Sequence, residues 1–99
     1  MTVIWSAEAQ AQLAEIHEHI ARDSPRDAAA LIRRLIGRVA QLETAQHSGR
    51  KVPEYPGEDL RELLCRPYRI IYRPRGGNVE VVTVMHYRQL LPLNPRELG

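Results

Sequence analysis

The run His86-Tyr87-Arg88, near the end of the sequence, places a titratable ring beside a guanidinium group. An imidazole changes its charge near neutral pH and can serve as a general base or acid, and an arginine can pair with a phosphate or a carboxylate. Arg88 would project to the same side as His86 if an extended strand continued through both residues. The plainer interpretation is that His86 ends a strand and forms only local hydrogen bonds.

Basic residues are concentrated in the second half of the chain. From Arg50 onward there are eight arginines and one lysine against six acidic residues, whereas residues 1–49 carry five arginines against six acids. Guanidinium groups bind carboxylates and phosphates in a bidentate way, so this half suits an acidic protein segment or a nucleic acid. One interpretation is that surface acids such as Glu62 and Glu80 pair with individual arginines. The other is a basic patch on the open face of a sheet, formed by Arg61, Arg69, Arg73 and Arg88.

No pattern of cysteine and histidine residues predicts a metal or cofactor site. Cys65 is the single cysteine, which excludes an internal disulfide, and we interpret it as a buried thiol on a strand. His17 and His19 are two residues apart on a predicted helix and face different directions, and His47 does not join them. We therefore expect neither a metal nor a cofactor.

Two helices precede the basic half of the chain. The apolar residues 3–5 predict an opening strand, and Ser6 follows as an N-cap. Ser24-Pro25 then starts a second helix, because proline is well tolerated at the first helical position. Helical spacing predicts two inward faces: Ala9, Leu13, Ile16 and Ile20, then Ala28, Leu31, Leu35, Val39 and Leu42. These segments form a helical hairpin over about residues 6–44, in which we expect Gly37 to permit close packing.

Three closely spaced strands are predicted within residues 60–88, at residues 60–65, 68–73 and 79–86. Residues 45–59, which contain several prolines and glycines, predict a loop, and residues 74–78 predict a hairpin turn. Alternation in the middle strand puts Tyr68, Ile70 and Tyr72 on one face and Arg69, Ile71 and Arg73 on the other. The last strand is too continuously apolar for an edge, so we place it inside the sheet. Residues 89–99 form a tail.

The length of 99 residues, with 43% hydrophobic and 26% charged residues, indicates one globular domain over residues 1–99. The order of the elements predicts an α+β fold, in which an N-terminal strand and a helical hairpin pack on a small antiparallel sheet. No apolar run approaches the roughly 18 residues that a membrane helix needs. Residues 1–5 do not resemble a signal peptide either, so we expect a cytoplasmic protein.

Five segments carry a resemblance to a known group of proteins. They are Val3-Ile4-Trp5-Ser6, Gly49-Arg50-Lys51-Val52-Pro53-Glu54, Leu60-Arg61-Glu62-Leu63, Tyr68-Arg69-Ile70-Ile71-Tyr72 and Val84-Met85-His86-Tyr87-Arg88. In this order they resemble the RelE/ParE toxin superfamily, and most closely its ParE-like, plasmid-stabilisation branch. The resemblance runs from Val3 to about Leu91. It implies a helical hairpin on an antiparallel sheet, and a cognate antitoxin whose C-terminal segment wraps the toxin.

The resemblance also implies one of two targets, because RelE-like members cut messenger RNA on the ribosome and ParE-like members inhibit DNA gyrase. Metal-free RNA cleavage needs a base, an acid and cations around the phosphate. The candidates for that chemistry are Lys51, Arg61, His86 and Arg88. Lys51 is the only lysine, however, and Cys65 stands at a strand position where RelE-like toxins tend to carry a basic residue. Residues 89–93 also lack the expected tyrosine.

We therefore expect a ParE-like toxin that is not an enzyme, poisons DNA gyrase and is neutralised by a cognate antitoxin in a hetero-oligomer. One alternative is a RelE-like, ribosome-dependent endoribonuclease, and another is a non-toxic remnant that only binds its antitoxin and represses their operon. Trp5 belongs either to the core or to a groove that accepts an antitoxin helix. The predicted contacts with antitoxin or target are Trp5, Arg61, Arg69, Arg73, His86 and Arg88.

Overall fold

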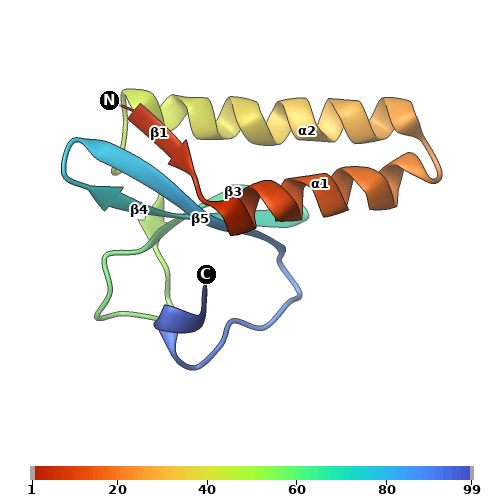
Figure 1. Ribbon diagram of the computed structural model, residues 1–99. Coiled ribbons are helices and arrows are strands. Elements are labelled where there is room, and N and C mark those ends of the chain that lie inside the picture. The colour runs from red at the N-terminus through yellow and green to blue at the C-terminus, as the bar shows by residue number, and fades with distance from the viewer. Residues whose placement is uncertain (1, 99) are drawn as a thin grey trace.

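The elements follow one another as a strand, two helices and four further strands, with a 3-10 turn after the second helix and another near the C-terminus. The computed structural model describes residues 2–98, so Met1 and Gly99, the ends of the predicted domain and tail, lie outside the described residues. The elements are β1 (Thr2–Trp5), α1 (Ala7–Ala21), α2 (Pro25–Ala40), η1 (Gln41–Glu43), β2 (Arg50–Lys51), β3 (Arg61–Cys65), β4 (Tyr68–Arg75), β5 (Asn78–His86) and η2 (Pro95–Leu98) (Figure 1). This order confirms the predicted α+β class.

Each helix begins at a serine cap. The Ser6 hydroxyl accepts a hydrogen bond from the Ala9 N–H (3.0 Å), and the Ser24 hydroxyl accepts one from the Asp27 N–H (3.1 Å). Such caps satisfy backbone donors that the first helical turn leaves unpaired. The predicted inward face of the second helix is confirmed, since all of its members are buried: Ala28, Leu31, Leu35 and Val39 of α2, and Leu42 of η1.

Gly37 does not bring the two helices together, so the predicted close packing at this residue is wrong. A Cβ placed on Gly37 meets no atom within 4 Å. The reason is helical geometry: Leu35 and Val39 point into the core, and Gly37, midway between them, points to solvent.

The five strands form one sheet in the order β1-β5-β4-β3-β2. The last strand, β5, therefore lies inside the sheet, as its continuous apolar sequence predicts. The sheet differs from the prediction in two respects. First, β1 pairs with β5 in parallel while the other pairs are antiparallel. Second, the predicted loop at residues 45–59 contains the two-residue edge strand β2, which pairs with Glu62 and Arg61 of β3.

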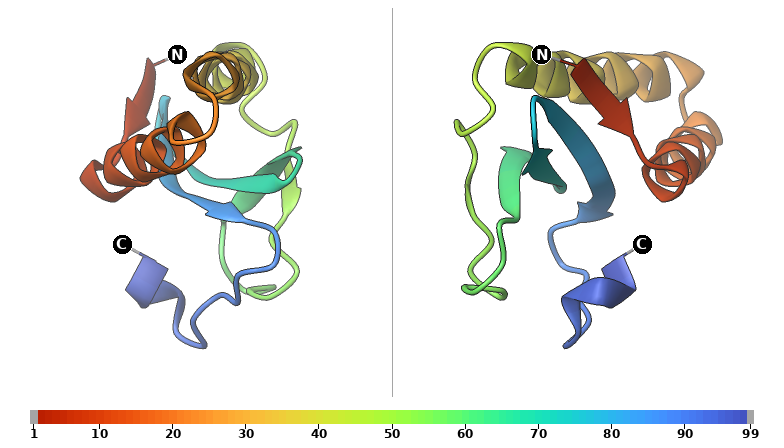
Figure 2. Two further views of the ribbon diagram at one scale, coloured as in Figure 1. Left: turned by 90° about the vertical axis from the view of Figure 1, so that its right-hand side faces the viewer. Right: turned by 60° about the vertical axis from the view of Figure 1, so that its left-hand side comes forward.

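The two faces of the sheet carry separate apolar clusters, and the predicted alternation along β4 is confirmed. Ile70 and Tyr72 belong to the cluster under the helices, whereas Ile71 belongs to the cluster on the opposite face. Figure 2 shows the helices over one face, and the loop before β3 and the C-terminal segment on the other side. That second face is covered in part by Val52, Tyr55 and Leu60 from the loop and by Leu91 and Leu98 from the C-terminal segment.

The loop before β3 is anchored to the sheet at Gly49. Its N–H donates a hydrogen bond to the hydroxyl oxygen of Tyr72 (2.9 Å), a side chain that is fully buried. A Cβ on Gly49 would lie 2.5 Å from the Glu62 carbonyl oxygen and 2.8 Å from the Tyr72 ring. Any residue with a Cβ would therefore clash at position 49, and only glycine fits there. Burial of the Tyr72 side chain raises the pKa of its hydroxyl.

The C-terminal segment packs back on the loop rather than extending into solvent. The Tyr55 hydroxyl donates a hydrogen bond to the Pro92 carbonyl, and Leu98 is buried, whereas Leu90 and Leu93 are almost fully exposed. Within residues 2–98, neither helix has the length and the apolar character that crossing a membrane requires.

Candidate functional site

A groove of about 750 Å³ opens beside the turn that joins β3 to β4. Leu64 and Arg69 lie directly opposite each other in the strand register, so both side chains stand on the sheet face that the helices leave free. We call this site the β3–β4 groove. It is lined by Arg50, Pro53, Glu54, Leu64, Arg66, Pro67, Tyr68, Arg69 and Tyr87.

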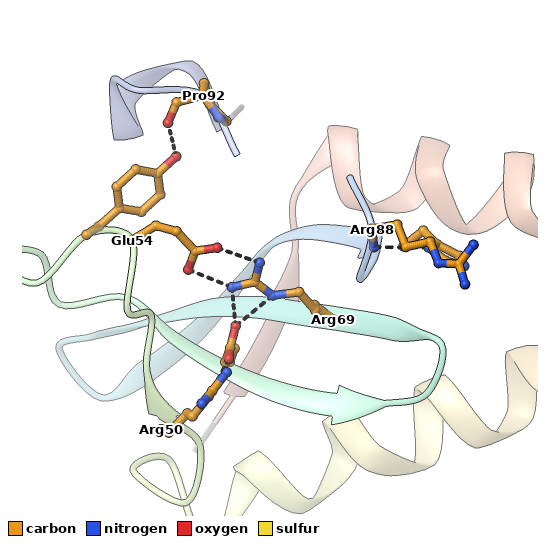
Figure 3. Close-up of polar contacts among 8 residues, drawn as sticks. Arg50, Glu54, Arg69, Arg88 and Pro92 are labelled. Carbon is orange, nitrogen blue, oxygen red and sulfur yellow. Dashed lines mark hydrogen bonds and ion pairs between the residues drawn. The ribbon is translucent and has the colours of Figure 1, made fainter. Parts of the chain in front are cut away.

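Arg69 lies at the centre of a chain of ion pairs along the groove (Figure 3). Its Nη1 and Nη2 atoms donate to the two carboxylate oxygens of Glu54 (2.8 and 3.0 Å), and its Nε and Nη2 atoms donate to Glu62 Oε1 (2.8 and 2.5 Å). Arg50 Nε donates to the other oxygen of Glu62 (2.5 Å). The Glu62 side chain is 0% exposed and that of Arg69 is 9% exposed, so these charges are balanced within the protein.

The ion pairs change the acidity of the groups that form them. Hydrogen bonds from Arg69 lower the pKa of Glu54 below its ordinary value. The same bonds, followed by those to Glu62, raise the pKa of Arg69. Arg69 is therefore a fully paired cation that joins the loop to the sheet, and its charge is already neutralised in the isolated chain.

The predicted patch of Arg61, Arg69, Arg73 and Arg88 is not formed as one surface. Arg61 stands opposite Tyr72, which faces the helices, and donates to the Gly49 and His47 carbonyl oxygens (2.9 and 3.3 Å). Arg73 pairs with Glu80 (3.5 Å). Of the two interpretations left open, individual ion pairs hold for Arg69 and Arg73, and strand alternation turns Arg61 away from the face that carries Arg69.

His86 ends β5 and bonds to its neighbours in sequence. Its N–H donates to Gln89 Oε1 (2.8 Å), and its Nδ1 accepts a hydrogen bond from the Arg88 N–H (3.1 Å). The chain turns after His86, so Arg88 does not continue the strand as the prediction of a shared side required. The ring lies edge-on to Tyr68 (5.7 Å between centroids) and stacks on Tyr87 (4.8 Å), which the Arg88 guanidinium covers at 5.5 Å.

The residues proposed for RNA cleavage do not converge. Lys51 pairs with Asp59 (3.7 Å), and Arg61 is held by loop carbonyls at the start of β3. His86 lies opposite Tyr68 and Arg61 opposite Tyr72, which places the two at opposite ends of β4. Four residues along a strand span about 13 Å, and the contacts with Asp59 and with the loop carbonyls hold Lys51 and Arg61 at their own end of the sheet.

Trp5 lies at a second depression, beside the edge strand β1. It is partly buried against the core under the helices. The depression has a volume of about 510 Å³ and is lined by Val3, Ile4, Trp5, Gln10, Leu13 and Ile36. Trp5 thus contacts the core and also forms part of an apolar surface depression, so both roles considered for it are compatible with its position.

Cys65 is buried, as predicted for a thiol on a strand, and its sulfur lies 3.9 Å from Arg34 Nη2. In residues 2–98, no group of three or more His, Cys, Asp or Glu side chains is arranged to hold a metal ion.

Several groove residues were not selected from the sequence, notably Arg50, Glu54, Leu64 and Arg66. The exposure of Leu64 could have been predicted, because strand alternation puts this residue on the opposite face from the buried Leu63 and Cys65. Glu54 and Arg50 were not, because they come from a loop whose path over the sheet no periodic pattern describes.

Comparison with known proteins gives consistent results. The family model for the ParE toxin of the type II toxin–antitoxin system parDE matches residues 3–91. A protein of Sinorhizobium fredii described as "Putative toxin Y4kP" is 37% identical over 92 residues, which cover 89% of this chain and 90% of that protein. The chromosomal ParDE toxin–antitoxin system of P. aeruginosa contains a chain with a TM-score of 0.73 and 25% identity, covering 87% of this chain and 95% of that one. The chain therefore belongs to the ParE family of toxins of type II toxin–antitoxin systems.

Proposed function

We propose that this ParE-family toxin inhibits DNA gyrase in the cytoplasm and that a cognate antitoxin neutralises it. The family match supports the toxin–antitoxin context, and the solved relative from P. aeruginosa is described as part of a ParDE system. A toxin of this kind acts by binding an essential protein, so it needs an accessible recognition surface and no catalytic centre.

The four ribonuclease candidates fall into two groups at opposite ends of the sheet, Lys51 with Arg61 and His86 with Arg88, and this separation is the observation that carries the proposal. Lys51 and Arg61 lie at one end of the sheet, in contact with Asp59 and loop carbonyls, and His86 lies at the other end. General acid–base cleavage requires the base, the acid and the cations to surround a single phosphate. This arrangement favours inhibition by binding over RNA cleavage.

The β3–β4 groove offers the surface for such binding. Leu64 and Tyr87 are 42% and 52% exposed, an apolar and aromatic pair at a site where Arg66 adds a positive charge. Among residues 2–98, no carboxylate forms an ion pair with Arg66 or Arg88. Exposed aromatic residues and arginines are typical of the residues that dominate binding energy at protein interfaces. We assign the groove to the target and the Trp5 depression to an antitoxin helix.

The test is a gyrase assay with the purified chain, released from its antitoxin and added across a concentration series. We expect the unmodified chain to inhibit supercoiling and to stabilise double-strand breaks. A Leu64→Glu/Arg66→Glu variant should need a much higher concentration for both effects. Arg73→Glu serves as the matched control, since Arg73 does not line the groove. Growth arrest without any effect on gyrase would overturn the proposal, and message cleavage on translating ribosomes would then favour the ribonuclease alternative. A harmless protein that still binds its antitoxin would identify the non-toxic remnant.

A further inference from the structure

The two helices carry opposite net charges. α1 contains three glutamates and no arginine or lysine, whereas α2 contains four arginines and a single acid, Asp27. The four arginines are Arg26, Arg33, Arg34 and Arg38, and we call them the α2 arginine stripe. In residues 2–98 no carboxylate forms an ion pair with any of them. The stripe is therefore a concentration of positive charge on one helix.

Two arginines of the stripe point directly away from the core. Arg26 and Arg33 are two helical turns apart and exposed, on the side of α2 opposite the buried Leu31 and Leu35. The first and last members of the stripe, Arg26 and Arg38, are separated by about 18 Å along the helix axis. The stripe thus follows most of the length of α2.

The other two arginines are oriented by backbone carbonyls. Arg34 Nη2 donates to the Arg66 carbonyl oxygen (3.2 Å), and Arg38 Nε donates to the Leu64 carbonyl oxygen (3.4 Å). A carbonyl has no net charge, so these bonds hold the guanidinium groups without neutralising them. A guanidinium group has five N–H donors, so donors remain for an anion that approaches from solvent.

The surroundings of the stripe favour a phosphate backbone over a protein surface. Ala30, Gly37 and Gln41 are the small or polar residues near the arginines, and the exposed apolar residue of α2, Ile36, lines the Trp5 depression instead. Binding energy at protein interfaces is concentrated in buried aromatic and arginine anchors, and single-stranded nucleic acids stack their bases on aromatic rings. The sequence of α2 contains no aromatic residue. A duplex, which carries one negative charge per about 1.7 Å of its axis, needs only the positive charge.

We propose that the α2 arginine stripe binds the phosphate backbone of duplex DNA without reading its sequence. Guanidinium groups pair with phosphates in a bidentate way, and such contacts carry no sequence information. The negative charge of α1 is repelled by DNA, which orients the molecule with α2 toward the duplex.

The stripe adjoins the surface that we assign to the target. Arg66, whose carbonyl oxygen accepts from Arg34, lines the β3–β4 groove. A toxin bound to gyrase through the groove would therefore place the stripe beside the DNA that gyrase engages. This role at gyrase rests on the proposed function, whereas the binding of DNA by the isolated chain does not.

Fluorescence anisotropy of a labelled DNA duplex, titrated with the purified chain free of antitoxin, tests the proposal. If each of the four arginines neutralises one phosphate, the logarithm of the affinity should fall with the logarithm of the salt concentration with a slope of about −3.6. Arg26→Gln/Arg33→Gln removes two of these charges at exposed positions. It should reduce the slope to about −1.8 and weaken binding at low salt by at least about tenfold.

The matched control removes the same net charge elsewhere. Arg73→Gln/Arg75→Gln changes two arginines of β4 that lie within 3.5 and 4.0 Å of Glu80. This variant should bind the duplex within about twofold of the unmodified chain, because its arginines are not in the stripe. Circular dichroism checks that both variants remain folded. Equal weakening in the two variants would show an effect of net charge alone and would overturn the proposal.

Other outcomes separate this proposal from the inhibition of gyrase. A chain that inhibits gyrase but does not bind the duplex at low salt would overturn the DNA proposal alone. A chain that binds the duplex through the stripe but leaves gyrase unaffected would overturn the proposed function and support the DNA proposal. Equal or tighter binding to the single strand of the same sequence would overturn the choice of a duplex. Loss of antitoxin binding in Arg26→Gln/Arg33→Gln, with unchanged duplex binding, would assign the stripe to the antitoxin and overturn the proposal.

Discussion

The Arg69 guanidinium donates hydrogen bonds to both carboxylate oxygens of Glu54, at 2.8 and 3.0 Å, and so connects the loop before β3 to β4, the middle strand of the sheet. The same guanidinium also bonds to the buried Glu62. One side chain therefore neutralises a buried acid and holds the wall of the groove in place.

Replacing Arg69 should be strongly destabilising. Arg69→Met leaves the buried Glu62 with Arg50 as its remaining cation, and breaking a buried ion pair costs about 3–5 kcal/mol of unfolding free energy. We expect the low end of this range because the Arg50 contact persists. Urea denaturation measures the change. Arg73→Met, which breaks a partly exposed pair, should cost no more than about 1 kcal/mol, and equal losses in the two variants would contradict this account.

The Glu54–Arg69 pair should also make stability depend on pH. The pKa of Glu54 is below its ordinary value of 4.5 in the folded protein, so below about pH 4.5 the unfolded chain binds more protons than the folded one. The contribution of Glu54 is complete above that pH and is lost as the pH falls through the folded pKa. Its side chain is 43% exposed, so the effect is modest. Denaturation at pH 7 and pH 4 should show a smaller pH dependence for Glu54→Gln than for the unmodified chain.

Gly37→Ala should stabilise the protein. The residue sits inside α2 with open space around its missing Cβ, and glycine in a helix costs about 0.8–1.0 kcal/mol relative to alanine. For a domain of this size, such a gain raises the Tm by about 4–8 °C. Thermal denaturation followed by circular dichroism gives the answer, and a fall in Tm would mean that Gly37 has a packing role after all.

Gly49→Ala should have the opposite effect, although the chemical change is identical. The new methyl group would lie 2.5 Å from the Glu62 carbonyl oxygen and 2.8 Å from Tyr72, neither of which can move without disturbing the core. Overpacking of this kind costs about 1–3 kcal/mol. The same melting experiment tests this prediction. A variant as stable as the unmodified chain would show that the space around Gly49 accommodates a methyl group.

Lys51→Ala and His86→Ala should leave growth inhibition almost unchanged. If the protein acts by binding gyrase through the β3–β4 groove, neither residue supplies chemistry, and Lys51 bonds to Asp59 and the Glu58 carbonyl at the far end of the sheet. Loss of a general acid or base lowers a rate by about 10²–10⁴-fold. Induction from a repressible promoter, with antitoxin binding as a control for folding, measures the outcome. A drop of that size in either variant would revive the ribonuclease alternative.

Local patterns in the sequence were sufficient to predict the two helices and the four longer strands. Serine caps, helical spacing and strand alternation report contacts within a few residues, and they correctly placed the inward face of α2 and the two faces of β4. The order of those elements then indicated the α+β class, and the five matching segments indicated the toxin family.

The tertiary structure decided which charged side chains pair with each other and which strands lie next to each other in the sheet. Whether Arg69 was a free cation or a paired one depended on where Glu54, fifteen residues away in a loop, came to rest. Likewise, no strand sequence states its partner, so the parallel pairing of β1 with β5 and the pairing of β2 with β3 appear only once the sheet is assembled. The energy of an ion pair or a strand pair depends on the distance between the groups in space. Because the chain folds back on itself, residues far apart in the sequence can lie at that distance, and local sequence patterns do not report it.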